Sequence, residues 1–194
     1  LGIDELYGEQ GSDEIRGNEG DDLIYGGDGN DTLYGGSGND TLEAGSGDTS
    51  YLANKLYGEE GEDILKGGSA SDEIDGGTEN DTITGGDGND LIRGGDGEDT
   101  ISGEGGDDLI KGNKGRDTIS GGAGSDTFSY GQVEYSSDPD VITDFTAGSG
   151  GDKVDLTDLH INNPKATFPA DDFPFSLGYV RIQKDGQDTL IGYD

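Results

Sequence analysis

The chain has 194 residues, of which 44 are Asp or Glu, 11 are Lys or Arg and 40 are Gly, so its formal net charge is −33. Such a charge repels phosphate and argues against binding to nucleic acid or anionic lipid. The absence of Cys excludes disulfides and zinc–thiolate sites, and no apolar run approaches the 18 residues of a transmembrane segment. Leu, Ile, Val and Phe total 37 residues, a share typical of highly charged disordered chains, so folding must require a partner that neutralises the carboxylates.

A nine-residue repeat runs through residues 1–128. Its unit reads Gly-Gly-x-Gly-x-Asp-x-U-x, where U is a large apolar residue, as in GGDGNDLIR over residues 85–93. A fixed period of this length predicts a stack of similar structural units. An aspartate, replaced once by asparagine, marks each of fourteen turns: Asp4, Asp13, Asp22, Asp31, Asp40, Asn54, Asp63, Asp72, Asp81, Asp90, Asp99, Asp108, Asp117 and Asp126.

Each unit combines a glycine-rich turn with a short strand. Glycine permits a positive φ in the turn, and the Asp-x-U triplet is expected to extend so that U points inward and its two neighbours point outward. Nine residues make a strand and a turn, so eighteen make a full coil. The fold class predicted is all-β, a right-handed parallel β-roll. Its thin core comes from one apolar residue per unit: Leu6, Ile15, Ile24, Leu33, Leu42, Leu56, Leu65, Ile74, Ile83, Ile92, Ile101, Ile110, Ile119 and Phe128.

The sixth turn is irregular. Asp40 and Asp63 are 23 residues apart, which places an insertion of five residues near 43–56 and gives Asn54 the aspartate position. The glycine two residues before the aspartate position is replaced by Leu52, Ala70 and Glu79. Ala70 and Glu79 must each adopt the backbone shape that glycine provides, or the site relaxes. Turns six, eight and nine are therefore predicted to bind a cation most weakly.

From about residue 129 the repeat gives way to a segment richer in apolar residues that holds all four prolines. A solenoid needs a cap, because its last coil otherwise exposes the core and an unpaired strand edge. Residues 129–194 are therefore predicted to form a β-rich capping region, separate from the roll over 1–128. Residues 179–184 and 189–191, on either side of Asp185-Gly186, are typical of a β-hairpin. Phe128 and Phe145 are expected at the junction.

The turns carry the chemistry of a hard cation. Ca²⁺ takes six to eight oxygen ligands, and the turn supplies both carboxylate oxygens and carbonyls that flexible glycines can direct into the gap between stacked turns. Two turns, eighteen residues apart, are needed to surround one ion. Mg²⁺ is less suited because it demands a near-ideal octahedron. We therefore expect roughly eight to eleven calcium ions, held by the fourteen aspartate and asparagine residues given above.

Residues 1–128 resemble the RTX family of hemolysin-type calcium-binding repeats. The segments around Gly121–Phe128, Asp140–Phe145 and Gly151–Leu156 also resemble the flank that follows such repeats. The resemblance implies calcium between turns, export of an unfolded chain by the type I secretion machinery, and folding at the millimolar calcium outside the cell. Because the chain begins inside a unit, we expect it to be a piece of a larger secreted or cell-surface protein, of which an adhesin is one candidate, and to be monomeric itself.

Two functions other than a calcium-dependent folding module are to be compared with the sequence. A ligand-binding module for polysaccharide, ice or a cell surface is suggested by outward tyrosines, threonines and the cations Arg16, Arg93 and Lys111. Surface residues that simply favour strands explain most of these positions. An enzyme is not expected, because no nucleophile–base pair and no metal-bound water site stands out, and no catalytic motif of the family's toxins, proteases, lipases or epimerases is present.

Overall fold

The computed structural model describes residues 2–45, 54–130, 140–148 and 150–155, and the backbone of 179–184 and 187–192. Within this part of the chain all regular structure is β, and no helix is long and apolar enough to span a membrane. The strands are β1 (Glu5–Gln10), β2 (Glu14–Glu19), β3 (Leu23–Asp28), β4 (Thr32–Ser37), β5 (Thr41–Glu43), β6 (Lys55–Glu60), β7 (Ile64–Gly68), β8 (Glu73–Thr78), β9 (Thr82–Asp87), β10 (Leu91–Asp96), β11 (Thr100–Gly105), β12 (Leu109–Lys114), β13 (Thr118–Ser120), β14 (Thr127–Ser129), β15 (Val141–Ile142), β16 (Lys153–Asp155), β17 (Tyr179–Lys184) and β18 (Gln187–Gly192).

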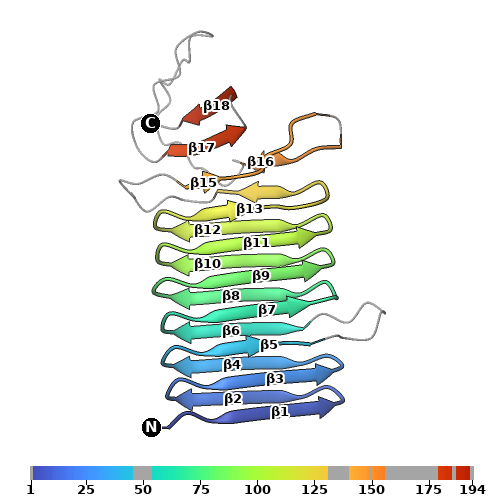
Figure 1. Ribbon diagram of the computed structural model, residues 1–194, viewed down its shortest axis with the longest axis vertical. Coiled ribbons are helices and arrows are strands. Elements are labelled where there is room, and N and C mark those ends of the chain that lie inside the picture. Colours follow the sequence, from blue (N-terminus) through green and yellow to red (C-terminus); the bar gives the residue numbers. More distant parts are fainter. Residues whose placement is uncertain are drawn as a thin grey trace, which may run out of the picture.

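The odd-numbered strands together with β18 form one sheet, here called sheet A, and the other even-numbered strands form a second, here called sheet B. Sheet A has the order β1-β3-β5-β7-β9-β11-β13-β15-β17-β18, and sheet B has the order β2-β4-β6-β8-β10-β12-β14-β16. Neighbouring strands up to β17 in sheet A and β16 in sheet B are parallel and in register, so that Ile92 of β10 pairs with Ile110 of β12. The chain thus crosses from one sheet to the other at every turn, as Figure 1 shows, and the predicted parallel β-roll is confirmed.

The strands are longer than the predicted Asp-x-U triplet. Most span six residues, begin one residue after the aspartate and continue through the first two positions of the following turn, which are both glycine in β10 from Leu91 to Asp96. The glycines stay in the ladder because their backbones pair with the next coil; Gly95, for example, pairs with Asn113. The aspartate therefore lies at the corner before each strand rather than within it.

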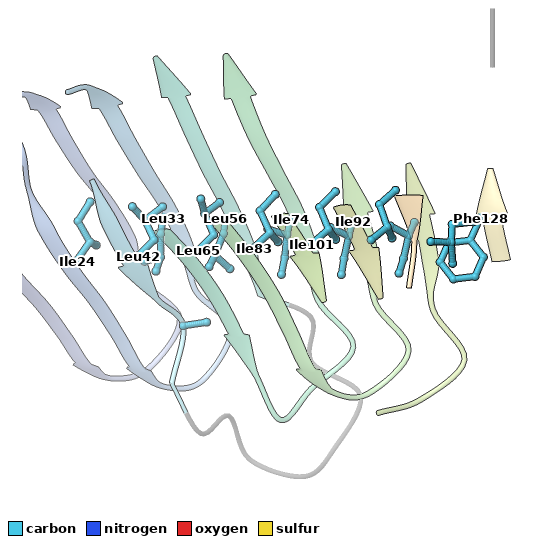
Figure 2. Close-up of a cluster of buried hydrophobic side chains, with 14 residues drawn as sticks. Ile24, Leu33, Leu42, Leu56, Leu65, Ile74, Ile83, Ile92, Ile101 and Phe128 are labelled. Atoms are coloured by element: carbon cyan, nitrogen blue, oxygen red, sulfur yellow. The ribbon is translucent and has the colours of Figure 1, made fainter. Parts of the chain in front are cut away.

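The apolar ladder fills the space between the sheets. Figure 2 shows the inward side chains of successive coils in a single file, and from Ile24 to Phe128 each is at most 1% exposed. Leu6 and Ile15, in the first coil, are only partly buried. Beyond Phe128 the file continues with Ile142, which is fully buried, and with Val154, which is partly buried. This one-residue-per-strand core confirms the inward assignment of the U positions.

The insertion leaves the pairing of the coils intact. Leu42 of β5 pairs with Leu65 of β7, and Leu33 of β4 pairs with Leu56 of β6, although each pair is separated by 23 residues instead of 18. Of the three positions that lack glycine, Glu79 adopts the expected left-handed conformation, with φ of 75°. Ala70 has no positive φ and so does not adopt the conformation that glycine provides, and Leu52 lies outside the described residues.

Left-handed residues also occur at positions where the sequence did not predict them. Glu9, Asn18, Glu59, Glu104 and Asn113 have φ between 70° and 76°. All five occupy the second glycine position of their unit. Non-glycine residues accept this conformation only at some energetic cost, so stacking of the coils must hold these turns in place.

Strands continue beyond the last repeat. β15 pairs with β13 and β16 pairs with β14, while β17 and β18 form the expected antiparallel hairpin, whose turn residues 185–186 lie outside the described part. The ring of Phe145 lies 6.1 Å from that of Phe128, so these two residues meet at the junction as expected. The division into a roll over 1–128 and a cap over 129–194 stays a prediction.

Candidate metal sites

The predicted aspartates lie in two columns, one along each edge where the chain crosses between the sheets. We call them column one and column two. Column one contains Asp4, Asp22, Asp40, Asp63, Asp81, Asp99 and Asp117, and column two contains Asp13, Asp31, Asn54, Asp72, Asp90, Asp108 and Asp126.

Within a column, one oxygen of each side chain from Asp22 onward accepts a hydrogen bond from the backbone of the coil before it. Oδ1 of Asp90 accepts a hydrogen bond of 2.8 Å from the backbone N–H of Asp72, and Oδ1 of Asp108 accepts one of 2.8 Å from that of Asp90. The same bond recurs along both columns at 2.7–3.0 Å. The carboxylates are therefore fixed in orientation by the fold itself.

The other oxygen, Oδ2, is buried without any hydrogen-bond partner. A buried carboxylate oxygen without a partner is unfavourable, and its repetition at regular intervals is not expected unless a cation completes the structure. This unpartnered Oδ2 occurs in twelve of the fourteen positions: Asp13, Asp22, Asp31, Asp40, Asp63, Asp72, Asp81, Asp90, Asp99, Asp108, Asp117 and Asp126.

Backbone carbonyls of the next coil approach the same place. A Cβ atom built on Gly17 would lie 2.5 Å from Oδ2 of Asp22, in its own turn, and 2.6 Å from the carbonyl oxygen of Gly35, in the turn above. A carboxylate from one turn and a carbonyl from the next thus converge where glycine leaves room. This mixed oxygen set fits Ca²⁺, which accepts both ligand types in flexible geometry.

Burial raises the pKa values of these carboxyl groups, because the ionised form loses its hydration. The backbone hydrogen bond to Oδ1 lowers the pKa, and repulsion from neighbouring carboxylates raises it further in all of these groups except Asp72, where the Asn54 side chain also lowers it. The pKa is raised to about 6 for Asp40, Asp63, Asp72 and Asp108, to about 7 for Asp90 and Asp99, and to about 8 for Asp81. A cation bound beside these carboxylates would favour their ionised form.

Among the described residues, no three Asp, Glu or His side chains converge as a metal-binding group. An ion in a column would therefore depend on carboxylates of stacked turns together with backbone carbonyls. This is the ligand mixture that the sequence predicted from the spacing of the turns.

Asn54 and Asp4 differ from the other column members. Oδ1 of Asn54 accepts a hydrogen bond of 3.0 Å from the backbone of Asp31, as an aspartate would. Its Nδ2, in place of an unpartnered oxygen, donates a hydrogen bond of 3.0 Å to Oδ1 of Asp72. Asp4 belongs to the first coil and its side chain is exposed. Neither residue presents the buried free oxygen of its neighbours.

Two further aspartates extend the columns beyond the predicted set. Oδ1 of Asp140 accepts a hydrogen bond of 3.0 Å from the backbone of Asp117, and Oδ1 of Asp152 accepts one of 3.1 Å from that of Asp126. The signal was present in the sequence, since Asp140-Val141-Ile142 and Asp152-Lys153-Val154 repeat the Asp-x-U pattern. It was missed because the spacing of nine residues is lost.

A second set of side chains forms an outer ladder on the turns, which the sequence reasoning also missed. In six turns the residue just before the column aspartate accepts a hydrogen bond from the backbone of the coil above it, as Asn89 does from Asp107 at 2.8 Å and Asp107 does from Ser125 at 2.8 Å. Column side chains bind the coil below, whereas these bind the coil above. These turns are therefore tied in both directions.

The outward tyrosines stack on one another. Tyr7 lies on Tyr25 and Tyr34 lies on Tyr57, each pair with ring centroids 5.0 Å apart. The guanidinium of Arg16 covers the other face of Tyr34 at 3.7 Å, beside a surface groove of about 380 Å³. Both faces of the Tyr34 ring are thus occupied by protein, as expected for a structural surface residue. A ligand-binding outer face stays a prediction.

Comparison with known families agrees with the repeat. The model described as RTX calcium-binding nonapeptide repeat (4 copies) matches residues 1–33, 16–51, 48–83, 66–101, 75–110 and 102–132. Together these matches cover the chain without a gap from residue 1 to residue 132. A comparison with curated proteins finds no match.

Proposed function

Because the chain belongs to the RTX calcium-binding nonapeptide repeat family, whose repeats bind multiple Ca²⁺ ions, we propose that it is a module that folds when calcium fills its two columns. The ligands are the column aspartates, each through its buried Oδ2, with backbone carbonyls of the stacked turn. The observation that carries the proposal is the row of twelve buried carboxylate oxygens without hydrogen-bond partners. Asn54 contributes only its amide oxygen, and Asp4 only an exposed carboxylate.

Calcium acts here as a condition for folding. The net charge of −33 and the core of one apolar side chain per strand leave little to offset the repulsion among buried carboxylates. An ion that binds only the folded roll stabilises it by mass action, so the binding free energy becomes folding free energy. Extracellular modules of this kind bind calcium at about 10⁻⁴–10⁻³ M.

The role in the parent protein follows from this dependence. RTX repeats are typical of secreted proteins, and a chain that stays unfolded at low calcium suits passage through a type I secretion channel. Folding then begins outside the cell, where the module supports the export and stability of a larger secreted or cell-surface protein, for which an adhesin is one candidate. The roll is a structural calcium-binding unit, and we assign no catalysis to it. The module acts as a monomer.

Far-UV circular dichroism of the purified chain tests this function. In EGTA the spectrum is expected to be that of a disordered chain, and millimolar Ca²⁺ is expected to produce a β spectrum, whereas Mg²⁺ at the same concentration is not. A β-rich spectrum in EGTA would sink the proposal. Counting bound ions by equilibrium dialysis should give roughly eight to eleven per chain.

A further inference from the structure

The outer face of sheet B has a surface groove of about 380 Å³ across β2, β4 and β6, the first three strands of that sheet (Figure 1). The groove arises at the second glycine position of three aligned units. Asn18 of β2 and Glu59 of β6 are in register with Gly36 of β4, which lies between them. The outer two strands thus carry side chains where the middle strand has none, and the buried backbone of Gly35 and Gly36 forms the floor.

The side chains on the β2 side of the groove are held in place by their own contacts. Nε and Nη2 of Arg16 donate hydrogen bonds of 3.2 and 2.7 Å to Glu14, and the guanidinium lies 3.7 Å from the centre of the Tyr34 ring. Nδ2 of Asn18 donates a hydrogen bond of 3.2 Å to the carbonyl of Arg16. A ligand therefore meets side chains that are already ordered, so its binding costs little conformational entropy.

Hydrogen-bonding atoms remain available in the groove. Within the described part of the chain, the carboxylate of Glu59 and Oδ1 of Asn18 have no hydrogen-bond or ion-pair partner. Glu59 and Glu60 line one side and would repel an anion, in the same direction as the net charge of −33. Arg16 lines the other side and would repel a cation. A neutral ligand rich in hydroxyl groups suits this mixture, because a hydroxyl donates to carboxylates and accepts from a guanidinium.

We propose that this groove binds one pyranose residue of a neutral polysaccharide. Sugar hydroxyls donate to the Glu59 carboxylate and to Oδ1 of Asn18, and a further sugar oxygen accepts from Arg16. The volume of the groove lies near the lower end of the range of about 300–1,000 Å³ for small-molecule sites, as expected for a single sugar ring. The ring of Tyr34 offers only its edge, because Arg16 covers one face and Tyr57 covers the other.

The groove exists only in the folded roll. Its walls come from three successive coils, and a Cβ atom at Gly35, in its floor, would overlap Oδ2 of Asp40, a carboxylate of column one. Because the roll is proposed to fold on calcium, sugar binding is expected in millimolar Ca²⁺ and not in EGTA. This calcium dependence rests on the proposed function, whereas the shape and chemistry of the groove do not.

Affinity electrophoresis of the full chain in millimolar Ca²⁺, with dextran, mannan or galactan in the gel, tests the groove. At least one of these neutral polysaccharides should retard the chain. Glu59→Gln removes the charged acceptor and is expected to raise Kd about tenfold. Glu104→Gln is the matched control, because Glu104 is also left-handed at a second glycine position but lies in sheet A, and its Kd should equal that of the natural chain.

A second pair of variants removes side chains without straining the backbone. Asn18 and Asn113 have left-handed φ of 75° and 71°, a conformation that glycine accepts. Asn18→Gly should raise Kd about fivefold, whereas Asn113→Gly, outside the groove, should not change it. Circular dichroism checks that each variant folds. If Glu59→Gln does not fold, Asn18→Gly decides, because it restores the usual residue of the repeat.

The possible outcomes separate the groove from the proposed function. A calcium-folded chain that none of the three polysaccharides retards refutes the groove and leaves the function standing. Retardation that Glu59→Gln and Asn18→Gly leave unchanged does the same. Retardation by carboxymethyl dextran but by no neutral polysaccharide would show an anionic ligand and overturn the proposed ligand class. A chain that is folded and retarded in EGTA refutes the calcium dependence and leaves the groove standing.

Discussion

The side-chain amide of Asn54 donates a hydrogen bond of 3.0 Å to Oδ1 of Asp72. At the corresponding place, the carboxylates next to it in column two have a buried oxygen without a partner. The side chain of Asn54 thus makes a hydrogen bond at the place where its neighbours in column two keep an oxygen free for a cation. Column two therefore lacks one free carboxylate oxygen at Asn54, next to the insertion between β5 and β6. We call this position the gap in column two.

Replacing Asn54 by aspartate should fill the gap. Asn54→Asp is expected to bind one more calcium ion than the natural chain, and to need more calcium before it folds, because the new carboxylate repels Asp72 until the ion arrives. Ion counting and a calcium titration followed by circular dichroism measure the two effects. Asn89→Asp makes the same change in the outer ladder and should alter neither. An unchanged ion count in Asn54→Asp would contradict the gap.

Two adjacent glycines should differ sharply in their tolerance of alanine. Gly106 has φ of +134°, and a Cβ there would overlap the carbonyl oxygen of Gly88. Gly105 has no such constraint, since its nearest neighbour would be a side-chain oxygen of Asp87 at 3.3 Å. In saturating calcium, Gly106→Ala should lower the free energy of unfolding by about 1–3 kcal/mol, and Gly105→Ala by much less. Equal losses in urea unfolding would show that coil spacing does not require glycine.

Without calcium, acid should favour the roll. The pKa values of Asp81, Asp90 and Asp99 are raised to about 7 or 8 in the fold, above those of the unfolded chain. Because the folded chain holds these protons more tightly, the carboxyl groups contribute their full stabilisation of the fold below about pH 4. That stabilisation is lost as the pH rises through about 6 to 8. Circular dichroism in calcium-free buffer should therefore show more β structure at pH 4 than at pH 8. In Asp81→Asn this dependence should weaken, and a β signal that falls on acidification would contradict the expectation.

Asp144 should couple the last coils. Its carboxylate accepts hydrogen bonds from the backbones of Gly121 at 3.0 Å and Gly122 at 2.8 Å, and from the hydroxyl of Ser120. Asp144→Ala leaves two backbone donors without this partner, which should cost about 1–3 kcal/mol and raise the calcium concentration at the folding midpoint. Ser120→Ala removes only the hydroxyl contact and should shift the midpoint less. If the natural chain, Asp144→Ala and Ser120→Ala all have the same folding midpoint, Asp144 does not stabilise the last coils.

Much of the fold could be predicted from the sequence because one period governs both strand pairing and side-chain direction. In the unit from Gly85 to Arg93, the positive φ of Gly86 and Gly88 and the burial of Asp90 and Ile92 all follow from position in the repeat. Strand length did not follow. The glycines after Ile92 pair with the next coil, a contact eighteen residues away that local propensity does not report.

The ends of the columns were harder to predict for a related reason. Asp140 and Asp152 join the columns through backbone partners 23 and 26 residues earlier. Their place in the columns is therefore set by the stacking of the coils and cannot be found from a fixed spacing in the sequence. The repeat motif likewise could not predict the orientation of the Asn54 side chain. Its residue type predicted a weaker ligand, but only the structure shows its amide turned toward Asp72.

The alternation of the chain between two sheets sets a rule for how such a molecule can change its length. Tyr34 and Tyr57 stack because both lie on sheet B, one coil apart. Loss of a single nine-residue unit from the gene between them would move every later strand to the opposite sheet and exchange the two columns, parting this pair. Gain or loss of two units would preserve every face and edge. Duplication in steps of eighteen residues is thus the change that keeps surface patterns intact.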